Sequence, residues 1–354
     1  MKDFLSSFAD SSQLESGYRN KKASAVFPEI PIMRFSVLAL LPLVCGVAFA
    51  AEEPLKLVKT IPLKGVDGKL DHLAVDAKGE MLYVANKPNN TLDVVDLKSG
   101  KMVKQIADQG KVSGVCVADD LGLVFVSNGA GVCNAFKIKD FESAFSAKAP
   151  GADNVHYCPD AKMVFVGHGE KLTIADAKTG EIKNTIALPG AIHGFALDSK
   201  LKKAFTVLTK PSVIAVVDLA KGEVTEKFPL TKSDAGSPIA YDAEHSKLFV
   251  GCPKKPMLIV FDSKTGKELE GIEIPGGVDD VHFDAKLDRV YASCGDGFLT
   301  VIGKKAKSEK YEVLAKLETP KFCRTCVFAD GKLYLGVPKG DGREGPEVRV
   351  YEAK

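Results

Sequence analysis

The sequence predicts an all-β fold, a seven-bladed β-propeller, and three observations support this prediction. An aromatic residue followed by two aliphatic or small residues recurs seven times, at spacings of 40 to 44 residues. Each repeat contains four short runs rich in β-branched and aromatic residues, bounded by Asp, Gly, Lys and Ser at turn positions. The last repeat has only three such runs, and a segment near residue 55 matches the missing one. Four strands in a period near 42 residues are typical of propeller blades.

The marker lies in the second strand of each repeat, where it begins as Tyr83-Val84-Ala85. It recurs as Phe125-Val126-Ser127, Phe165-Val166-Gly167, Phe205-Thr206-Val207, Phe249-Val250-Gly251, Tyr291-Ala292-Ser293 and Tyr334-Leu335-Gly336. The third strand ends in a turn that runs from Asp to Gly in four repeats: Asp96 to Gly100, Asp176 to Gly180, Asp218 to Gly222 and Asp262 to Gly266. Asp can bond its own backbone two residues on, and Gly supplies a positive φ. We interpret these residues as structural turn residues rather than as catalytic or binding residues.

The final repeat lacks an outer strand of its own. Its three runs lie around Cys326 to Phe328, Leu333 to Val337 and Val348 to Tyr351, after which the chain ends. The segment from Leu55 to Pro62 resembles the outer-strand run from Lys183 to Pro189. We therefore expect the mature N-terminal strand to pair in the last blade and close the ring, which removes the open sheet edges.

The motifs Tyr83-Val84-Ala85-Asn86 and Asp93-Val94-Val95-Asp96, together with the Lys-Thr-Gly turns, resemble the YVTN-repeat β-propeller family. The resemblance covers residues 54–354 and extends to its YncE-like bacterial members. It implies a seven-bladed propeller in an exported protein. Members of that family include surface-layer proteins, extracellular binding proteins and a periplasmic propeller associated with DNA, so the resemblance implies no single function.

Residues 33–50 have the form of a signal peptide, with one positive charge, a short apolar run and the small-residue end Ala48-Phe49-Ala50. Residues 1–32 are polar and precede a second Met, so we interpret them as a mis-called N-terminal extension. The domain is expected to be 51–354, periplasmic or extracellular, with no transmembrane segment in the mature chain. The formal charge is +2 for the whole chain and about +1 for residues 51–354, which offers no concentrated basic surface and argues against nucleic-acid binding. We expect a monomer.

A ring of polar residues marks the start of every innermost strand: Asp71, Ser113, Asp153, His193, Ser237, Asp279 and Arg324. The next positions hold His72, Asn154 and Asp280, and the positions after those are apolar. Convergent polar groups at one mouth of the channel are where a small ligand or a partner's loop would bind. We expect the ligand-binding residues to be Asp71, His72, Asp153, Asn154, His193, Asp279, Asp280 and Arg324. A channel mouth is hydrated in any propeller, so the alternative that these polar residues have only a structural role stays open.

The ends of the second strands, namely Asn86, Asn128, His168, Leu208, Cys252, Cys294 and Val337, are expected on the same face. His168, His193, Cys252 and Cys294 are metal-ligand types, but they lack short ligand spacing. His156 and His282 are interpreted as channel-wall residues. We expect no metal, no cofactor and no catalytic residue. Two alternatives stay open: a calcium- or zinc-assisted hydrolase using Asp71, Asp153, Asp279 and Asp280 as ligands, and a cell-surface interaction protein.

Seven cysteines lie in 51–354, and Cys323 and Cys326 form the only close pair. Val327 follows this pair where a haem-attachment motif has His, so haem attachment is not indicated. The segment reads as a strand rather than the helix start of a redox motif. Export to an oxidising compartment would permit a disulfide between Cys323 and Cys326, and this alternative stays open.

Overall fold

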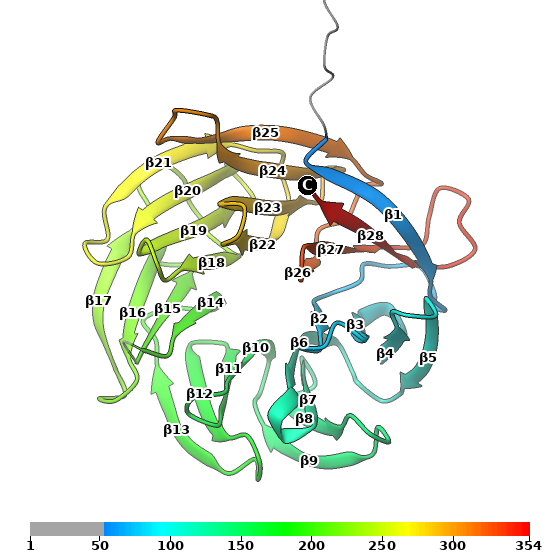
Figure 1. The fold of residues 1–354 in the computed structure, drawn as a ribbon. Coiled ribbons are helices and arrows are strands. Elements are labelled where there is room, and N and C mark those ends of the chain that lie inside the picture. Colours follow the sequence, from blue (N-terminus) through cyan, green and yellow to red (C-terminus); the bar gives the residue numbers. More distant parts are fainter. Residues whose placement is uncertain (1–52, 201) are drawn as a thin grey trace, which may run out of the picture. The chain divides into compact units, whose positions relative to one another are not determined.

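The computed structural model describes residues 53–200 and 202–354, which form seven four-stranded antiparallel sheets arranged as a ring (Figure 1). The first strand of each sheet lies nearest the axis, and the innermost strands contact one another around the whole ring. The predicted seven-bladed propeller is therefore confirmed. The predicted extension over 1–32 and signal peptide over 33–50 lie outside the described residues.

Each of the first six blades is continuous in sequence, and its strands follow one another from the axis outward. Blade 1 contains β2 (Leu73–Val75), β3 (Met81–Asn86), β4 (Thr91–Asp96) and β5 (Lys101–Ile106), with the 3-10 turn η1 (Lys87–Asn89). Blade 2 contains β6 (Val112–Ala118), β7 (Leu123–Asn128), β8 (Val132–Lys137) and β9 (Ser143–Lys148), with η2 (Asp119–Leu121). Blade 3 contains β10 (Ala152–Cys158), β11 (Met163–His168), β12 (Lys171–Asp176) and β13 (Ile182–Ala187).

The remaining blades repeat this order until the last one. Blade 4 contains β14 (Ile192–Asp198), β15 (Lys203–Leu208), β16 (Val213–Asp218) and β17 (Glu223–Pro229). Blade 5 contains β18 (Ile239–Asp242), β19 (Lys247–Cys252), β20 (Met257–Asp262) and β21 (Glu268–Glu273). Blade 6 contains β22 (Val278–Asp284), β23 (Arg289–Cys294), β24 (Phe298–Lys304) and β25 (Tyr311–Glu318). Blade 7 contains β26 (Cys326–Ala329), β27 (Lys332–Val337), β28 (Glu347–Ala353) and β1 (Leu55–Pro62).

Ring closure occurs as predicted, because β1 pairs antiparallel with β28 as the outer strand of blade 7 (Figure 1). The pairing runs from Leu55 opposite Ala353 to Pro62 opposite Glu347. Leu55 and Ile61 are fully buried in this strand, whereas Leu57 and Val58 are about half exposed. One face of β1 thus completes the core of blade 7, and the other faces solvent.

The Asp-to-Gly turns have the predicted local structure. Oδ1 of Asp176 accepts hydrogen bonds from the backbone N–H groups of Lys178 and Thr179, and Gly180 has a φ of 74°. The equivalent glycines, Gly100, Gly222 and Gly266, also have positive φ. Because the carboxylates are used by the turns, these residues are structural.

Aromatic side chains pack between neighbouring blades. The marker residue of one blade contacts a residue on the innermost strand of the next: Phe125 with Tyr157, Phe205 with Tyr241, Phe249 with Phe283 and Tyr291 with Phe328, at ring-centroid distances of 4.8 to 6.5 Å. Such pairs add packing energy beyond the buried area. This packing holds the innermost strands close enough to bring their polar ends together at one mouth.

Candidate functional site

The starts of the innermost strands are irregular where the sequence places polar residues. The ladder to the second strand is interrupted between Val112 and Val115, between Ala152 and Val155, between Ile192 and Gly194, and between Val278 and Asp280. A bulge bends a strand and re-aims the side chains of its extra residue. The positions between these pairs include Ser113, Asp153, His193 and Asp279, so the bulges coincide with the predicted ring.

Gly114 permits the close approach of blades 2 and 3 at this level. A methyl group added to it would meet the carbonyl oxygen of Asp153 and would lie 2.7 Å from Ser127 Oγ. We expect Gly114→Ala to lower the free energy of unfolding by about 1–3 kcal/mol, because a packed backbone must shift to admit the methyl. Urea unfolding followed by circular dichroism measures this. Gly110→Ala is the control, since its methyl would meet only Ala130 Cβ at 3.3 Å. Equal midpoints for the two variants would contradict the prediction.

All the predicted ligand-binding residues line one cavity of about 720 Å³ in the channel: Asp71, His72, Asp153, Asn154, His193, Asp279, Asp280 and Arg324. They come from five blades. Lys87, Ser237 and Pro238 also line it, and its wall continues into apolar and aromatic residues including Phe195, Ile239 and Val281. This combination of an apolar wall and a few convergent polar groups is typical of small-molecule sites.

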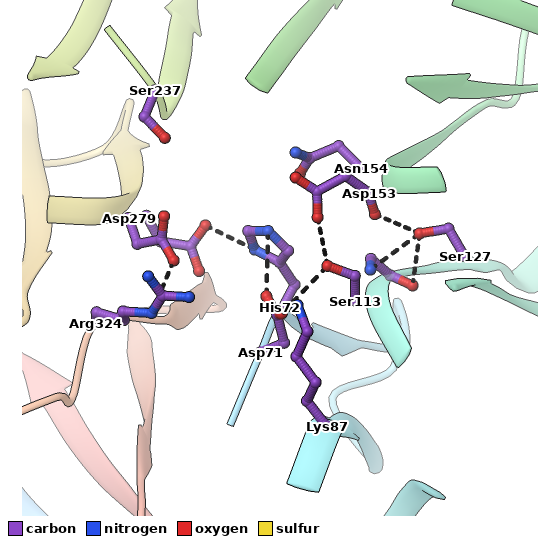
Figure 2. Close-up of polar contacts among 12 residues, drawn as sticks. Asp71, His72, Lys87, Ser113, Ser127, Asp153, Asn154, Ser237, Asp279 and Arg324 are labelled. Carbon is purple, nitrogen blue, oxygen red and sulfur yellow. Dashed lines mark hydrogen bonds and ion pairs between the residues drawn. The ribbon is translucent and has the colours of Figure 1, made fainter. Parts of the chain in front are cut away.

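The mouth residues form a chain of contacts from blade to blade, which we call the polar belt, and Figure 2 shows the part of it around His72, Ser113 and Asp153. Its members are Asp280, His72, Asp71, Ser113, Asp153, Asn154, His193 and Ser237. The single O–H of Ser113 is shared between two carboxylates: its Oγ lies 3.2 Å from Oδ2 of Asp71 and within hydrogen-bond distance of Oδ1 of Asp153. Asn154 Nδ2 donates to the carbonyl of His193, whose Nδ1 lies 3.3 Å from Ser237 Oγ. No hydrogen bond or ion pair among the described residues continues the belt from Ser237 to Asp279.

His72 crosses the ring between two blades that are not neighbours. It belongs to blade 1, and its Nδ1 lies 3.0 Å from Oδ1 of Asp280 in blade 6. The other oxygen of Asp280 accepts a hydrogen bond of 3.0 Å from the backbone N–H of Cys326 in blade 7. Asp280 therefore joins blades 6, 7 and 1 at the point where the ring closes.

Charges on the same side of the mouth are paired. Asp71 Oδ2 lies 2.5 Å from Lys87 Nζ, and Arg324 Nε lies 3.1 Å from Asp279 Oδ2. Burial would raise the pKa of Asp71, but the charges of His72 and Lys87 hold it below its usual value. Burial would lower the pKa of His72, whereas the carboxylate of Asp280 raises it well above its usual value. His72 is therefore an imidazolium cation at neutral pH.

Asp279 has a raised pKa, in contrast to the lowered pKa of Asp71. Burial raises this pKa to about 6, although the charges of Arg324 and His72 oppose the shift. The corresponding pKa in an unfolded chain is about 3.9. Keeping Asp279 ionised therefore costs stability above pH 6, and shifted carboxylates of this kind are enriched at functional sites.

We expect Asp279→Asn to change how stability depends on pH. Because the folded pKa lies above the unfolded one, the wild-type protein loses stability as the pH rises from about 4 through 6, by about 3 kcal/mol in total. The variant lacks this loss. Urea unfolding at pH 4, 5, 6 and 7 should show the difference between variant and wild type growing in favour of the variant. Asp160→Asn, on an exposed turn, is the control. Parallel pH profiles for Asp279→Asn and wild type would refute the assigned ionisation.

Two histidines line the channel beyond the belt, as expected for the wall positions His156 and His282. Nε2 of His282 lies 2.9 Å from the carbonyl oxygen of Cys326, and the ring of His156 contacts Phe195 edge-on at 4.5 Å. Desolvation by the channel wall lowers the pKa of His156 to about 4, although its side chain is exposed to the channel, and also lowers that of His282. Both imidazoles are therefore neutral at physiological pH.

The second-strand ends do not line the cavity, although the sequence places them on the same face. His168 is buried within blade 3, where its Nε2 lies 2.7 Å from Thr173 Oγ1, and Cys252 and Cys294 are fully buried. Among residues 53–200 and 202–354, no three His, Cys, Asp or Glu side chains are placed to hold a metal ion. All seven cysteines from Cys116 to Cys326 are free thiols, including the pair at 323 and 326.

Lys87 is the mouth residue that the sequence argument missed. It directly follows Asn86, the end of the second strand in blade 1. Because the second-strand ends were expected on the mouth face, its position in the sequence could have indicated it. The other blades carry no Lys at that position, which hid the signal from a comparison of repeats. Its ammonium group lies against Asp71 (Figure 2).

Comparisons with known proteins support the architecture. The chain is similar to a solved structure of Kuenenia stuttgartiensis hydrazine synthase, with a TM-score of 0.69 and 13% sequence identity over 77% of this chain and 94% of that chain. At this identity the likeness shows the β-propeller fold alone. No family model matches the chain, and no curated protein matches it. Within the described residues, no helix could cross a bilayer.

Proposed function

We propose that this protein is an exported, non-catalytic binding protein that holds a small polar ligand in the mouth of its channel. The observation that carries the proposal is the gathering of eight polar residues from five blades around one cavity of about 720 Å³. That volume lies within the range of pockets that enclose small ligands. The proposal includes export, which is inferred from the signal-peptide pattern of residues 33–50. It also includes the likeness to YVTN-repeat propellers, which is inferred from the repeat motifs.

The raised pKa of Asp279 supports a binding role for the mouth over a purely structural one. Asp279 is only partly exposed and has a pKa of about 6, so its ionised form is maintained at a cost to stability. A ring that served only to close the fold could hold neutral residues there. Interaction with a ligand at the mouth can offset such a cost, since any group that binds only the folded state stabilises it.

A thermal-shift screen of residues 51–354 tests the proposal. The panel contains amines, carboxylates, amino acids, sugars, Ca²⁺ and Zn²⁺. A ligand present at 100 times its Kd adds about 2.7 kcal/mol to stability and raises the melting temperature. Arg324→Gln and Asp153→Asn change the two sides of the cavity, and at least one of them should abolish the shift, whereas Arg343→Gln, outside the cavity, should keep it. A shift that neither cavity variant changes would place the ligand elsewhere, and no shift with any compound would count against the proposal.

A further inference from the structure

The cavity has two halves that differ in how their charges are paired. Blades 6, 7 and 1 hold three cations and three carboxylates in contact: Lys87 with Asp71, His72 with Asp280 and Arg324 with Asp279. The three positive and three negative formal charges of these pairs therefore sum to zero. The opposite half, from blades 3 to 5, contains Asp153, Asn154, His193 and Ser237.

Asp153 is the mouth carboxylate left over from this pairing. Its Oδ1 accepts a hydrogen bond from Ser113, and within the described part of the chain no basic side chain lies within ion-pair distance of it, although the charge of His72 acts on it from farther away. The neutral imidazoles of His156 and His282 add no compensating charge. His193 at the rim is exposed, and its ring bonds to Ser237 instead. The cavity is thus left with one negative charge on the side of blade 3.

The surroundings of Asp153 suit an organic cation. Farther along the channel on this side, Tyr157, Phe195 and Tyr241 line the cavity, and aromatic rings attract alkylammonium groups as well as their apolar parts. The rings of Tyr157 and Tyr241 also pack against Phe125 and Phe205 of the neighbouring blades. A metal ion needs several ligand atoms from His, Cys, Asp or Glu, and the described residues supply no such group here. The polar belt is also open next to this half, between Ser237 and Asp279, so a ligand can lie there without breaking a belt contact.

We propose that the cavity takes an organic monocation, a primary or quaternary ammonium compound, with its charge against the carboxylate of Asp153. The inference rests on the proposed function and names the ligand class of the same site. The alkyl part of the ligand lies against the aromatic wall. The paired half of the mouth provides polar contacts without competing for the positive charge.

Isothermal titration with four probes of similar size tests this inference: butylammonium, choline, 1-butanol and butyrate, at constant ionic strength. We expect the two cations to bind and the neutral and anionic probes to bind at least ~10-fold more weakly. Asp153→Asn should weaken the binding of both cations at least ~10-fold, because it removes the charge and keeps the shape. The matched control, Asp160→Asn, makes the same change on the surface of the same blade and should leave binding unchanged.

Asp153→Glu provides a second variant if Asp153→Asn does not fold, and it should retain preference for cations over butyrate. Equal binding of 1-butanol or butyrate, or full cation affinity in a folded Asp153→Asn protein, would overturn the inference. If a carboxylate or sugar from the wider screen binds and depends on Arg324, the proposed function stands and the cation assignment fails. If no compound binds at the mouth, both fail.

Discussion

Deleting residues 54–65 will destabilise the whole propeller, although the deleted segment is a single edge strand. The segment contains β1, which pairs along its length with β28, and it buries Leu55, Ile61 and Leu63 almost completely. Burying these three side chains contributes about 5 to 9 kcal/mol at 1.5 to 3 kcal/mol each. Domains of this kind have about 5 to 15 kcal/mol of total stability. We therefore expect most of the net stability to be lost.

Urea unfolding followed by circular dichroism, with size-exclusion chromatography, measures this effect. The deletion also exposes the edge of β28, so we expect self-association of the shortened chain. The control is the double variant Leu57→Ala and Val58→Ala, which changes the exposed face of the same strand and should cost at most about 1 kcal/mol. An unchanged midpoint after the deletion would show that blade 7 does not need β1.

Replacing Asp280 by Ala is expected to be the most damaging single change in the mouth. It leaves the imidazolium of His72 without its partner in blade 6 and the N–H of Cys326 without its acceptor. Breaking a buried ion pair by removing one member costs about 3 to 5 kcal/mol. Because Asp280 ties blade 6 to blades 7 and 1, the loss should appear as unfolding of the ring rather than local fraying.

The pH dependence of this variant distinguishes lost charge pairing from lost packing. The raised pKa of His72 means that the pair's stabilisation is complete below about pH 6.5 and is lost as the pH rises through the raised pKa. Asp280→Ala should therefore cost more at pH 6 than at alkaline pH. NMR titration should show a lower pKa for His72 in the variant. A cost independent of pH, with an unchanged His72 titration, would contradict the ion pair.

The repeats made the architecture predictable because strand patterning is local. Alternation, turn residues and the marker around Tyr83 each depend on neighbours in sequence, so counting strands was enough to predict seven blades. The three-stranded last repeat also identified residues 55–62 as its missing partner. Because equivalent positions in the seven repeats lie on the same face, the sequence alone predicted one mouth for Asp71, Asp153, His193, Asp279 and Arg324.

What the sequence by itself determined is therefore the ring, its closure and the face on which polar residues gather. Only the tertiary structure decided which of those residues touch. The reach of His72 across blade 7 to Asp280, the pairing of Lys87 with Asp71, the unpaired charge of Asp153 and the burial of His168 inside its blade depend on side-chain positions in different blades. Electrostatic pairing and desolvation act over a few ångströms in space, and residues 208 positions apart acquire that proximity only when the ring has closed.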